Sequence, residues 1–249
     1  MSEPFPVSVR NLTMAHGENV VQRDVTFDVK KGEVMVVMGE SGCGKSTLLR
    51  HLIGLNVPAS GQVLRNGIDI WNCDNIVHDS ILRSSGILYQ GGALWTSMTL
   101  EENVSLPLVQ FTDYDKGTIH DIAEYKLSLV GLSGCGDLYP SEISGGMRKR
   151  AGLARAMALD PDVLFFDEPS AGLDPLSARR LDRLILELRE SLGTTLIVIT
   201  HELASIFTIA NTSIFLDAET KTMTAWGDPR ELRKNCENEN VRKFLNSGE

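Results

Sequence analysis

Residues 39–46 read Gly39-Glu40-Ser41-Gly42-Cys43-Gly44-Lys45-Ser46, which matches the phosphate-loop pattern G-x-x-x-x-G-K-[ST]. An apolar run at 34–38 precedes this stretch and a helical run from Thr47 follows it, which is the strand-loop-helix context that the pattern requires. Glycines let the backbone turn so that several N–H groups point at one phosphate, and the start of the helix adds partial positive charge. Residues 39–47 therefore predict a nucleotide-binding loop.

Two side chains of this loop have specific roles in the prediction. Lys45 is expected to reach the β- and γ-phosphates of the nucleotide. Ser46 is expected to offer its hydroxyl to Mg²⁺, which keeps most of its other ligands as water and phosphate oxygen. The alternative is a glycine-rich turn of purely structural role, and the flanking strand and helix argue against it. The predicted cofactors are ATP and Mg²⁺.

A pair of adjacent acids follows a second apolar run, at residues 163–166. These acids are Asp167 and Glu168. Because ligands of a parallel sheet bind beyond the carboxyl ends of its strands, both acids can face the phosphates held by the loop. Asp167 is then suited to hold Mg²⁺, and Glu168 to orient and deprotonate the attacking water. Taken alone, a pair of acids in a solvated turn is an equally good interpretation.

A third phosphate-directed feature is Ser144-Gly145-Gly146, which opens a small-residue helix expected over residues 145–159. Ser144 can cap this helix, and the free N–H groups of its first turn can bind an anion. A plain N-cap is the alternative. Because the chain holds two other phosphate-directed elements, we favour anion binding.

The remaining pattern predicts an α/β fold. Val25, Phe27 and Val29 alternate with polar residues as in a half-buried strand, and Asn66-Gly67 suits a type I′ hairpin turn within residues 62–70. A mostly helical region is expected between this hairpin and residue 140, with a helix at 118–130. Strands then alternate with helices, which implies parallel pairing. The expected elements are strands at 163–166 and 195–200, helices at 176–192 and from about 203, and a hairpin formed by 213–216 and 222–226.

The helix at 176–192 has a clear apolar face and ends before Gly193, as amphipathic spacing and the C-terminal glycine rule predict. Asp174, followed by Pro175 at the first helical position, is a sound N-cap for it. The residues expected to be buried along this face are Leu181, Leu184, Ile185, Leu188 and Leu192.

Composition excludes several classes of protein. With 249 residues and 42% hydrophobic residues the chain can build a sizeable core. A formal charge of −9 argues against a general nucleic-acid-binding surface, which needs clustered Lys and Arg. The one basic run, residues 148–150, is interpreted as a polar helix face. Trp71, Trp95 and Trp226 are interpreted as packing residues rather than ligands.

No apolar run approaches the roughly 18 residues that a membrane-spanning helix needs. If the protein moves anything across a membrane, another chain is expected to form the path. The four cysteines show no zinc-ligand spacing and no secretory signal precedes them, so we expect a reducing cytoplasm.

Together these motifs resemble the ATP-binding-cassette (ABC) ATPase family over nearly the whole chain. Residues 39–46 resemble its Walker A loop and Asp167-Glu168 the end of its Walker B strand. Gln90 matches the Q-loop, residues 143–147 the signature motif, residues 171–174 the D-loop, and His201 the switch histidine. The resemblance implies one ATP-binding domain over residues 1–249, an ABC-type P-loop NTPase with a mixed central sheet, an antiparallel β subdomain and a helical lobe at about 90–160.

The resemblance also implies a head-to-tail dimer. Residues 144–146 of one copy would close on the γ-phosphate held by Lys45 of the other. A ligand contacted from both sides favours the closed pair through its differential affinity.

Gln90 would sense the γ-phosphate and Mg²⁺, whereas an ordinary loop amide is the alternative. His201 would hydrogen-bond the γ-phosphate, although a lone histidine is more often structural. The D-loop role of Asp174 comes entirely from the resemblance, and it is compatible with the N-cap role.

Two positions depart from the family pattern. Met147 stands where the family usually has glutamine, which removes a polar side chain near the ribose but leaves the glycines intact. His16, before Gly17, takes the place of the aromatic residue that stacks on adenine. Histidine can still stack on a base.

Within the family, residues 89–99, 144–150 and 241–245 resemble the phospholipid transport ATPases of Gram-negative bacteria that work with MCE-type proteins. This resemblance implies an integral membrane permease, an MCE-type lipid-binding protein and a small accessory subunit as partners, and a peripheral location on the cytoplasmic side of the inner membrane. The apolar loop at 91–108 could dock a coupling helix of the permease.

Two alternatives stay open. One is an ABC ATPase for another substrate, such as an amino acid, a metal or a lipoprotein. The other is a non-transport ABC ATPase of DNA repair or translation, although those usually carry a coiled-coil insertion or two cassettes in one chain.

Overall fold

The computed structural model describes residues 4–247 and places the strand before the phosphate loop in the middle of a sheet. This strand, β3 (Val34–Met38), is buried at all five positions and pairs in parallel with β8 (Thr195–Ile199) and β9 (Thr212–Asp217). Next to β8 come β7 (Val163–Asp167) and the edge strand β6 (Ser85–Leu88), also parallel. Apolar residues at every position of β3 suit a strand that is covered on both faces.

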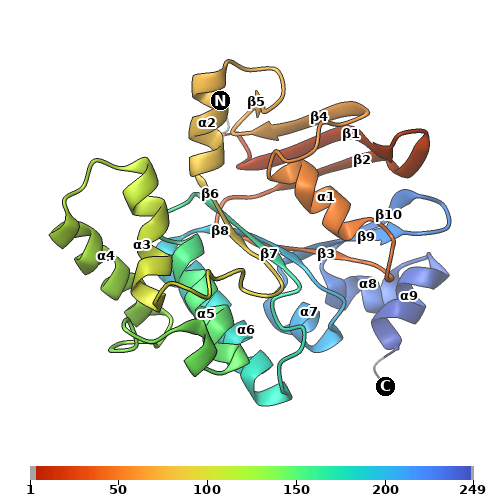
Figure 1. Cartoon of the computed structure of the whole chain (residues 1–249). Coiled ribbons are helices and arrows are strands. Elements are labelled where there is room, and N and C mark those ends of the chain that lie inside the picture. Colours follow the sequence, from red (N-terminus) through yellow and green to blue (C-terminus); the bar gives the residue numbers. More distant parts are fainter. Residues whose placement is uncertain (1–3, 248–249) are drawn as a thin grey trace.

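The antiparallel part extends the same sheet on its other side (Figure 1). Its strands are β1 (Val7–His16), β2 (Asn19–Val29), β4 (Ser60–Arg65), β5 (Ile68–Asp69) and β10 (Thr222–Gly227). The order across the sheet is β5-β4-β1-β2-β10-β9-β3-β8-β7-β6. At the predicted turn between β4 and β5, Asn66 and Gly67 have φ of 49° and 83°, as a type I′ turn requires. The predicted hairpin of β9 and β10 is confirmed as well.

The two faces of the parallel strands belong to two separate cores. Val36 of β3 packs in the core that the helices α3 (Leu100–Phe111) to α7 (Leu203–Ile209) cover. Val37, the next residue, packs in the other core with α1 (Lys45–Leu52) and strands β1, β2 and β4. Because successive side chains of a strand point to opposite faces, one apolar run serves both cores.

The predicted helical region is confirmed, and it stands beside the sheet at the left of Figure 1. No helix among residues 4–247 is both long and apolar enough to cross a membrane. The remaining helices are α2 (Asn75–Arg83), α4 (Lys116–Leu129), α5 (Gly145–Ala156), α6 (Pro175–Leu192), α8 (Pro229–Asn235) and α9 (Glu239–Asn246), with a short 3₁₀ turn at Pro140–Glu142.

Three expectations about these elements are wrong. The small-residue helix ends at Ala156 rather than at residue 159. Leu192 is 42% exposed, because it lies in the last turn of α6 beyond the part that packs on the sheet. Trp95 and Trp226 are 58% and 50% exposed, so they are surface residues, whereas Trp71 does pack against the core.

Candidate active site

The phosphate loop leaves β3 at the edge of the sheet where β7 and β8 also end. Val37 and Asp167 each pair with Ile199, so the three strands end in register. The loop at residues 39–46, the acids at 167 and 168, and His201 therefore leave the sheet side by side. This arrangement follows from parallel pairing and was expected from the sequence.

Glycine is required at two positions of the loop. Gly39 has φ of 148°, and a Cβ there would meet the Leu216 carbonyl oxygen at 2.5 Å. Gly44, the N-cap of α1, has φ of 102°, and a Cβ there would meet Val21 at 2.6 Å. Both positions therefore exclude larger residues by conformation and by space.

Lys45 folds back over its own loop. Its ammonium donates hydrogen bonds of 2.9 Å to the carbonyl oxygens of Gly39 and Glu40, and its side chain is buried. These bonds hold a positive charge at the mouth of the loop. Because ammonium is a compact charge on a flexible stem, it can turn from a carbonyl to a phosphate oxygen at small cost.

Gln22, which was not among the predicted site residues, holds the phosphate loop against β9. Its side-chain amide is fully buried and donates to the carbonyl oxygens of Cys43, at 2.7 Å, and Asp217, at 2.8 Å. Cys43 is also buried, and burial raises the pKa of its thiol, so the thiol stays protonated and packs as an apolar side chain.

Asp167 lies near the start of α1, where the side chain of Ser46 acts to lower its pKa. Burial raises the pKa of Asp167, and the neighbouring charge of Glu168 raises it further. A bound cation would relieve both effects, and hydroxyl and carboxylate oxygens are ligands that Mg²⁺ accepts. The described residues contain no cluster of three or more His, Cys, Asp or Glu able to hold a metal.

Glu168 presents its carboxylate between His201 and the cavity. One oxygen, Oε1, lies 2.8 Å from Nδ1 of His201. The other, Oε2, is buried and has no hydrogen-bond partner within residues 4–247. A buried acceptor without a partner costs free energy, which makes the Glu168 carboxylate, a side chain that lines the cavity, a candidate functional group. The direct contact between Glu168 and His201 was not predicted from the sequence.

A cavity of about 710 Å³ joins most of the predicted residues. Val21 and Phe244 also line it, and neither was predicted. Phe244 comes from α9 and packs on Phe215, with ring centroids 5.4 Å apart. The predicted residues that line this cavity are His16, Gly39, Glu40, Ser41, Gly42, Gly44, Lys45, Ser46, Thr47, Gln90, Glu168 and His201.

Cys43 and Asp167 lie next to the cavity without lining it, and four other predicted residues lie on a separate surface. Ser144 caps α5 by accepting a hydrogen bond from the Met147 N–H, and Asp174 caps α6 in the same way from Leu176 and Ser177. The two caps are neighbours, because a Cβ on Gly146 would lie 3.7 Å from the side chain of Ser177. Ser144, Gly145, Gly146 and Asp174 do not line the cavity that holds the phosphate loop.

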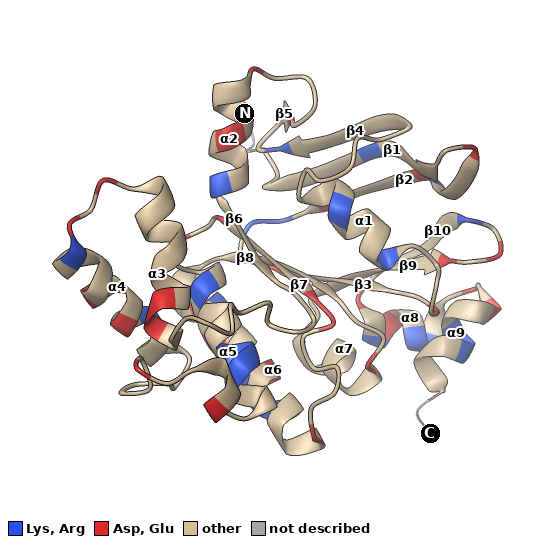
Figure 2. Ribbon diagram, in the orientation of Figure 1, with Lys and Arg blue, Asp and Glu red and all other residues tan. Residues whose placement is uncertain are grey.

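The prediction of a polar face for residues 148–150 is wrong for Lys149, whereas Arg148 is exposed and α5 is visibly basic (Figure 2). Lys149 is only 6% exposed and donates to three main-chain carbonyl oxygens. Arg148 donates to the carbonyl of Ile143, and Arg150 to those of Val130 and Gly131. These cations stabilise local backbone, and burial lowers the pKa of Lys149.

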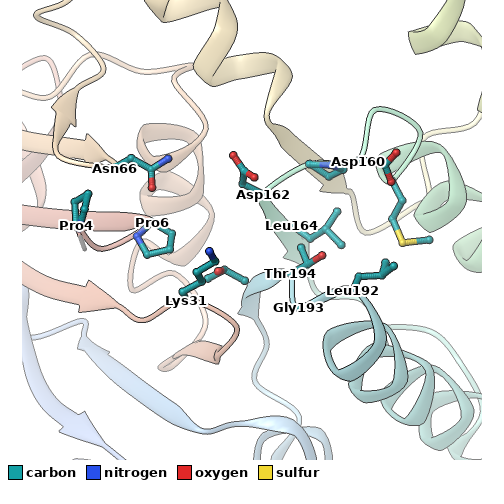
Figure 3. A pocket seen from close by; sticks show the side chains of 13 residues that line it. Pro4, Pro6, Lys31, Asn66, Asp160, Asp162, Leu164, Leu192, Gly193 and Thr194 are labelled. Carbon is teal, nitrogen blue, oxygen red and sulfur yellow. The ribbon is translucent and has the colours of Figure 1, made fainter. Parts of the chain in front are cut away.

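A second cavity, of about 510 Å³, opens at the opposite edge of the sheet where β7 and β8 begin (Figure 3). Lys31, Asn66 and Asp162 surround it together with apolar side chains. It has no glycine-rich loop, and none of the predicted site residues lines it. The glycine-rich loop lines the other cavity, at the carboxyl ends of the strands.

Comparison with known proteins gives a consistent result. The ABC transporter family profile matches residues 22–171. The chain is 41% identical over 240 residues to the Probable ribonucleotide transport ATP-binding protein mkl of Mycobacterium leprae, covering 96% of this chain and 68% of that protein. It is 36% identical over 239 residues to the Intermembrane phospholipid transport system ATP-binding protein MlaF of Escherichia coli K12, covering 96% and 88%.

Solved structures agree with these relatives. CbiO1 of Clostridium perfringens, part of the ABC transporter complex cbiONQ, superposes with a TM-score of 0.85 at 26% identity, covering 97% of this chain and 94% of that chain. The ATP-binding cassette MJ0796, in a dimer bound to ADP and Pi, gives 0.79 at 27% identity, covering 89% and 98%. The phosphate loop, the paired acids and these matches agree: the chain belongs to the ABC transporter family and is one of its ATP-binding, ATP-hydrolysing subunits.

Proposed function

We propose that this chain hydrolyses ATP in a site shared between two copies and thereby drives phospholipid transport between the inner and outer membranes. The separation of the candidate residues into two groups supports the shared site. One group lines the cavity with Lys45, and the other caps α5 and α6 outside it. A second copy, placed head to tail, would bring the caps to the phosphates. The solved dimer of MJ0796 with ADP and Pi supports such a pairing.

In this proposal the residues of the cavity have distinct roles. Lys45 and the loop N–H groups hold the phosphates, and His16 stacks on the base. Ser46, Asp167 and Gln90 hold Mg²⁺, which supplies positive charge to the phosphate oxygens when bound. Glu168, which lines the cavity, takes the proton of the attacking water while His201 holds its Oε1.

Phospholipid is the proposed cargo because the relatives named MlaF include one that is 41% identical over 205 residues. The similarity of residues 89–99 to that group supports the same assignment. The name of the mycobacterial relative offers a ribonucleotide as the alternative cargo. We also propose that residues 1–249 form one ATP-binding domain with a helical lobe at about 90–160.

A rigid, exposed loop near Gln90 is the proposed docking site for the membrane permease. Its Trp95 is 58% exposed. The loop is held by Asn103, whose fully buried amide exchanges hydrogen bonds of 2.7 and 3.0 Å with the main chain of Trp95 and also donates to the Met98 carbonyl. An exposed aromatic side chain on a rigid loop suits an interface anchor.

The test uses the chain co-purified with its membrane partner and reconstituted in vesicles that contain labelled phospholipid or labelled ribonucleotide. ATP-dependent movement of phospholipid alone is expected, and movement of ribonucleotide alone would refute the proposed cargo. Trp95→Glu should lower transport per ATP hydrolysed. Trp226→Glu, which changes an equally exposed tryptophan on β10, is the matched control and should leave this ratio unchanged.

A further inference from the structure

Lys149 makes the most extensive side-chain contact between the signature helix and the catalytic segment. Its ammonium lies within hydrogen-bond distance of the carbonyl oxygens of Glu168, at 3.3 Å, Pro169, at 2.5 Å, and Ala171, at 2.7 Å. An ammonium has three N–H donors, and this one meets three carbonyl oxygens. The side chain is 6% exposed, so solvent competes little for these bonds.

The segment that Lys149 holds has a backbone that needs support. Glu168 has φ of 47°, in the left-handed region that residues other than glycine seldom adopt. Such a conformation persists only when the surrounding structure maintains it. The Glu168 N–H donates to the Ile199 carbonyl at 2.9 Å, and Lys149 binds the carbonyl on the other side of the same residue. The two contacts together fix the direction in which the Glu168 side chain leaves the strand.

The Lys149 ammonium also contacts the segment that leads to the surface proposed to contact the second copy. Lys149 lies one turn after Gly145, the first residue of α5, and Ala171 begins the segment that leads to the cap residue Asp174. A displacement of α5 would therefore move both the carbonyl of Glu168 and the start of this segment.

We propose that Lys149 is a positioning residue for ATP hydrolysis, because it fixes the turn at residues 168–171 to the signature helix and so aims the Glu168 carboxylate. This inference rests on the proposed role of Glu168 as the base. Contact between the helix end of one copy and the phosphates of the other would reach Glu168 through this side chain.

The other cations of α5 provide matched comparisons. Arg150 donates to the carbonyls of Val130 and Gly131, within the helical region, and Arg155 to those of Gly92 and Ala93. Each binds main-chain oxygens, as Lys149 does, but among residues 4–247 these hydrogen bonds go to segments other than 168–171. A general stabilising role of cations on α5 would make Lys149 and Arg150 equivalent.

The experiment compares Lys149→Met, Lys149→Arg and Arg150→Met in the full chain. We measure kcat and KM for ATP, the affinity for a fluorescent ATP analogue, and the melting temperature. Lys149→Met should lower kcat by roughly 10- to 100-fold, the range that a displaced catalytic group produces. The affinity for the analogue should stay unchanged, because Lys45 and its loop are untouched. Lys149→Arg should restore most of kcat, and Arg150→Met should retain it.

Removing Lys149 from a chain that already carries Glu168→Gln provides the specific readout. If Lys149 acts by aiming that carboxylate, Lys149→Met should cause little further loss there. A Lys149→Met chain with wild-type kcat would overturn the inference, as would an equal loss in Arg150→Met or a full further loss in the Glu168→Gln background. Should Lys149→Met fail to fold, Lys149→Gln takes its place; its shorter side chain has two N–H donors for the three carbonyl oxygens, so a smaller loss of kcat is expected and a wild-type kcat would again count against the inference. Normal hydrolysis by Glu168→Gln alone would instead refute the assignment of the base.

Discussion

Glu168→Gln is the substitution that separates nucleotide binding from hydrolysis in this site. The carboxylate uses Oε1 to contact Nδ1 of His201 at 2.8 Å, and Oε2 is buried without a partner. Glutamine has the same shape and can keep its carbonyl oxygen toward His201. The amide then places NH₂ where Oε2 was, and an amide nitrogen cannot accept a proton from water.

The size of the effect follows from this change. A positioned general base contributes roughly 10²- to 10⁴-fold to a rate, which corresponds to about 2.7 to 5.4 kcal/mol of activation free energy. The loop at residues 39–46 keeps all its contacts, because Lys45 and Gln22 bind main-chain oxygens away from Glu168. The free energy of ATP binding should therefore change by less than about 1 kcal/mol. A loss of kcat without a loss of binding indicates an interaction that acts in the transition state.

Phosphate release at saturating ATP measures the first quantity, and titration with a fluorescent ATP analogue measures the second. Glu202→Gln is the matched control, since Glu202 is an acid on the same edge of the sheet that does not line the cavity. Its turnover should stay close to that of the wild type. Turnover by Glu168→Gln within a few-fold of the wild type, or loss of ATP binding in that variant, would refute the assigned role.

Three further predictions concern the supporting structure. Gln22→Leu leaves the buried Cys43 carbonyl without its donor, so KM for ATP in steady-state kinetics should rise; an unchanged KM would count against support of the loop. Gly86→Ala places a Cβ 2.1 Å from the Ala156 carbonyl oxygen, so urea denaturation should show a loss of at least about 1–3 kcal/mol, and wild-type stability would contradict the packing of β6 against α5. Asp217 accepts hydrogen bonds from the Thr220 and Glu219 N–H groups, which lower its pKa below 3.8, so Asp217→Ala should cost roughly 1–3 kcal/mol at neutral pH. An acid whose pKa is lower in the folded chain stabilises the fold at pH values above its pKa in the unfolded chain, and this stabilisation is lost as the pH falls. The loss of stability in Asp217→Ala should therefore shrink below pH 3.8, and a loss that grows with acid would contradict the assignment.

Local signals in the sequence were sufficient for the elements that position the phosphates. The glycine pattern of residues 39–46 fixes a loop between a strand and a helix, and Asn66-Gly67 fixes a two-residue turn, because few other residues adopt these conformations. Parallel pairing then brought Asp167 and Glu168 to the same edge as the loop.

Contacts between distant segments could not be predicted in the same way. A basic residue on a helix has the same pattern whether it faces solvent or main-chain oxygens, so Lys149 was assigned to a polar face. Gln22 is one of several polar residues on β2 and has no distinguishing pattern. Its two acceptors, the carbonyls of Cys43 and Asp217, come together only where the loop packs against β9. Phe244 reaches the cavity because α9 returns to β9, which no local pattern indicates.

The shared site can be tested directly by mixing two inactive chains. A Lys45→Ala chain lacks the ammonium that binds the phosphates. A Ser144→Arg chain has a bulky side chain at the helix end that would contact the phosphates of its partner. Each alone should hydrolyse ATP poorly, because both sites of its dimer carry the defect. In a mixed dimer one site combines the intact Lys45 of one chain with the intact Ser144 of the other, so hydrolysis should return on mixing. A mixture that stays as inactive as its two parents, although mixed dimers form, would contradict a site built from two copies.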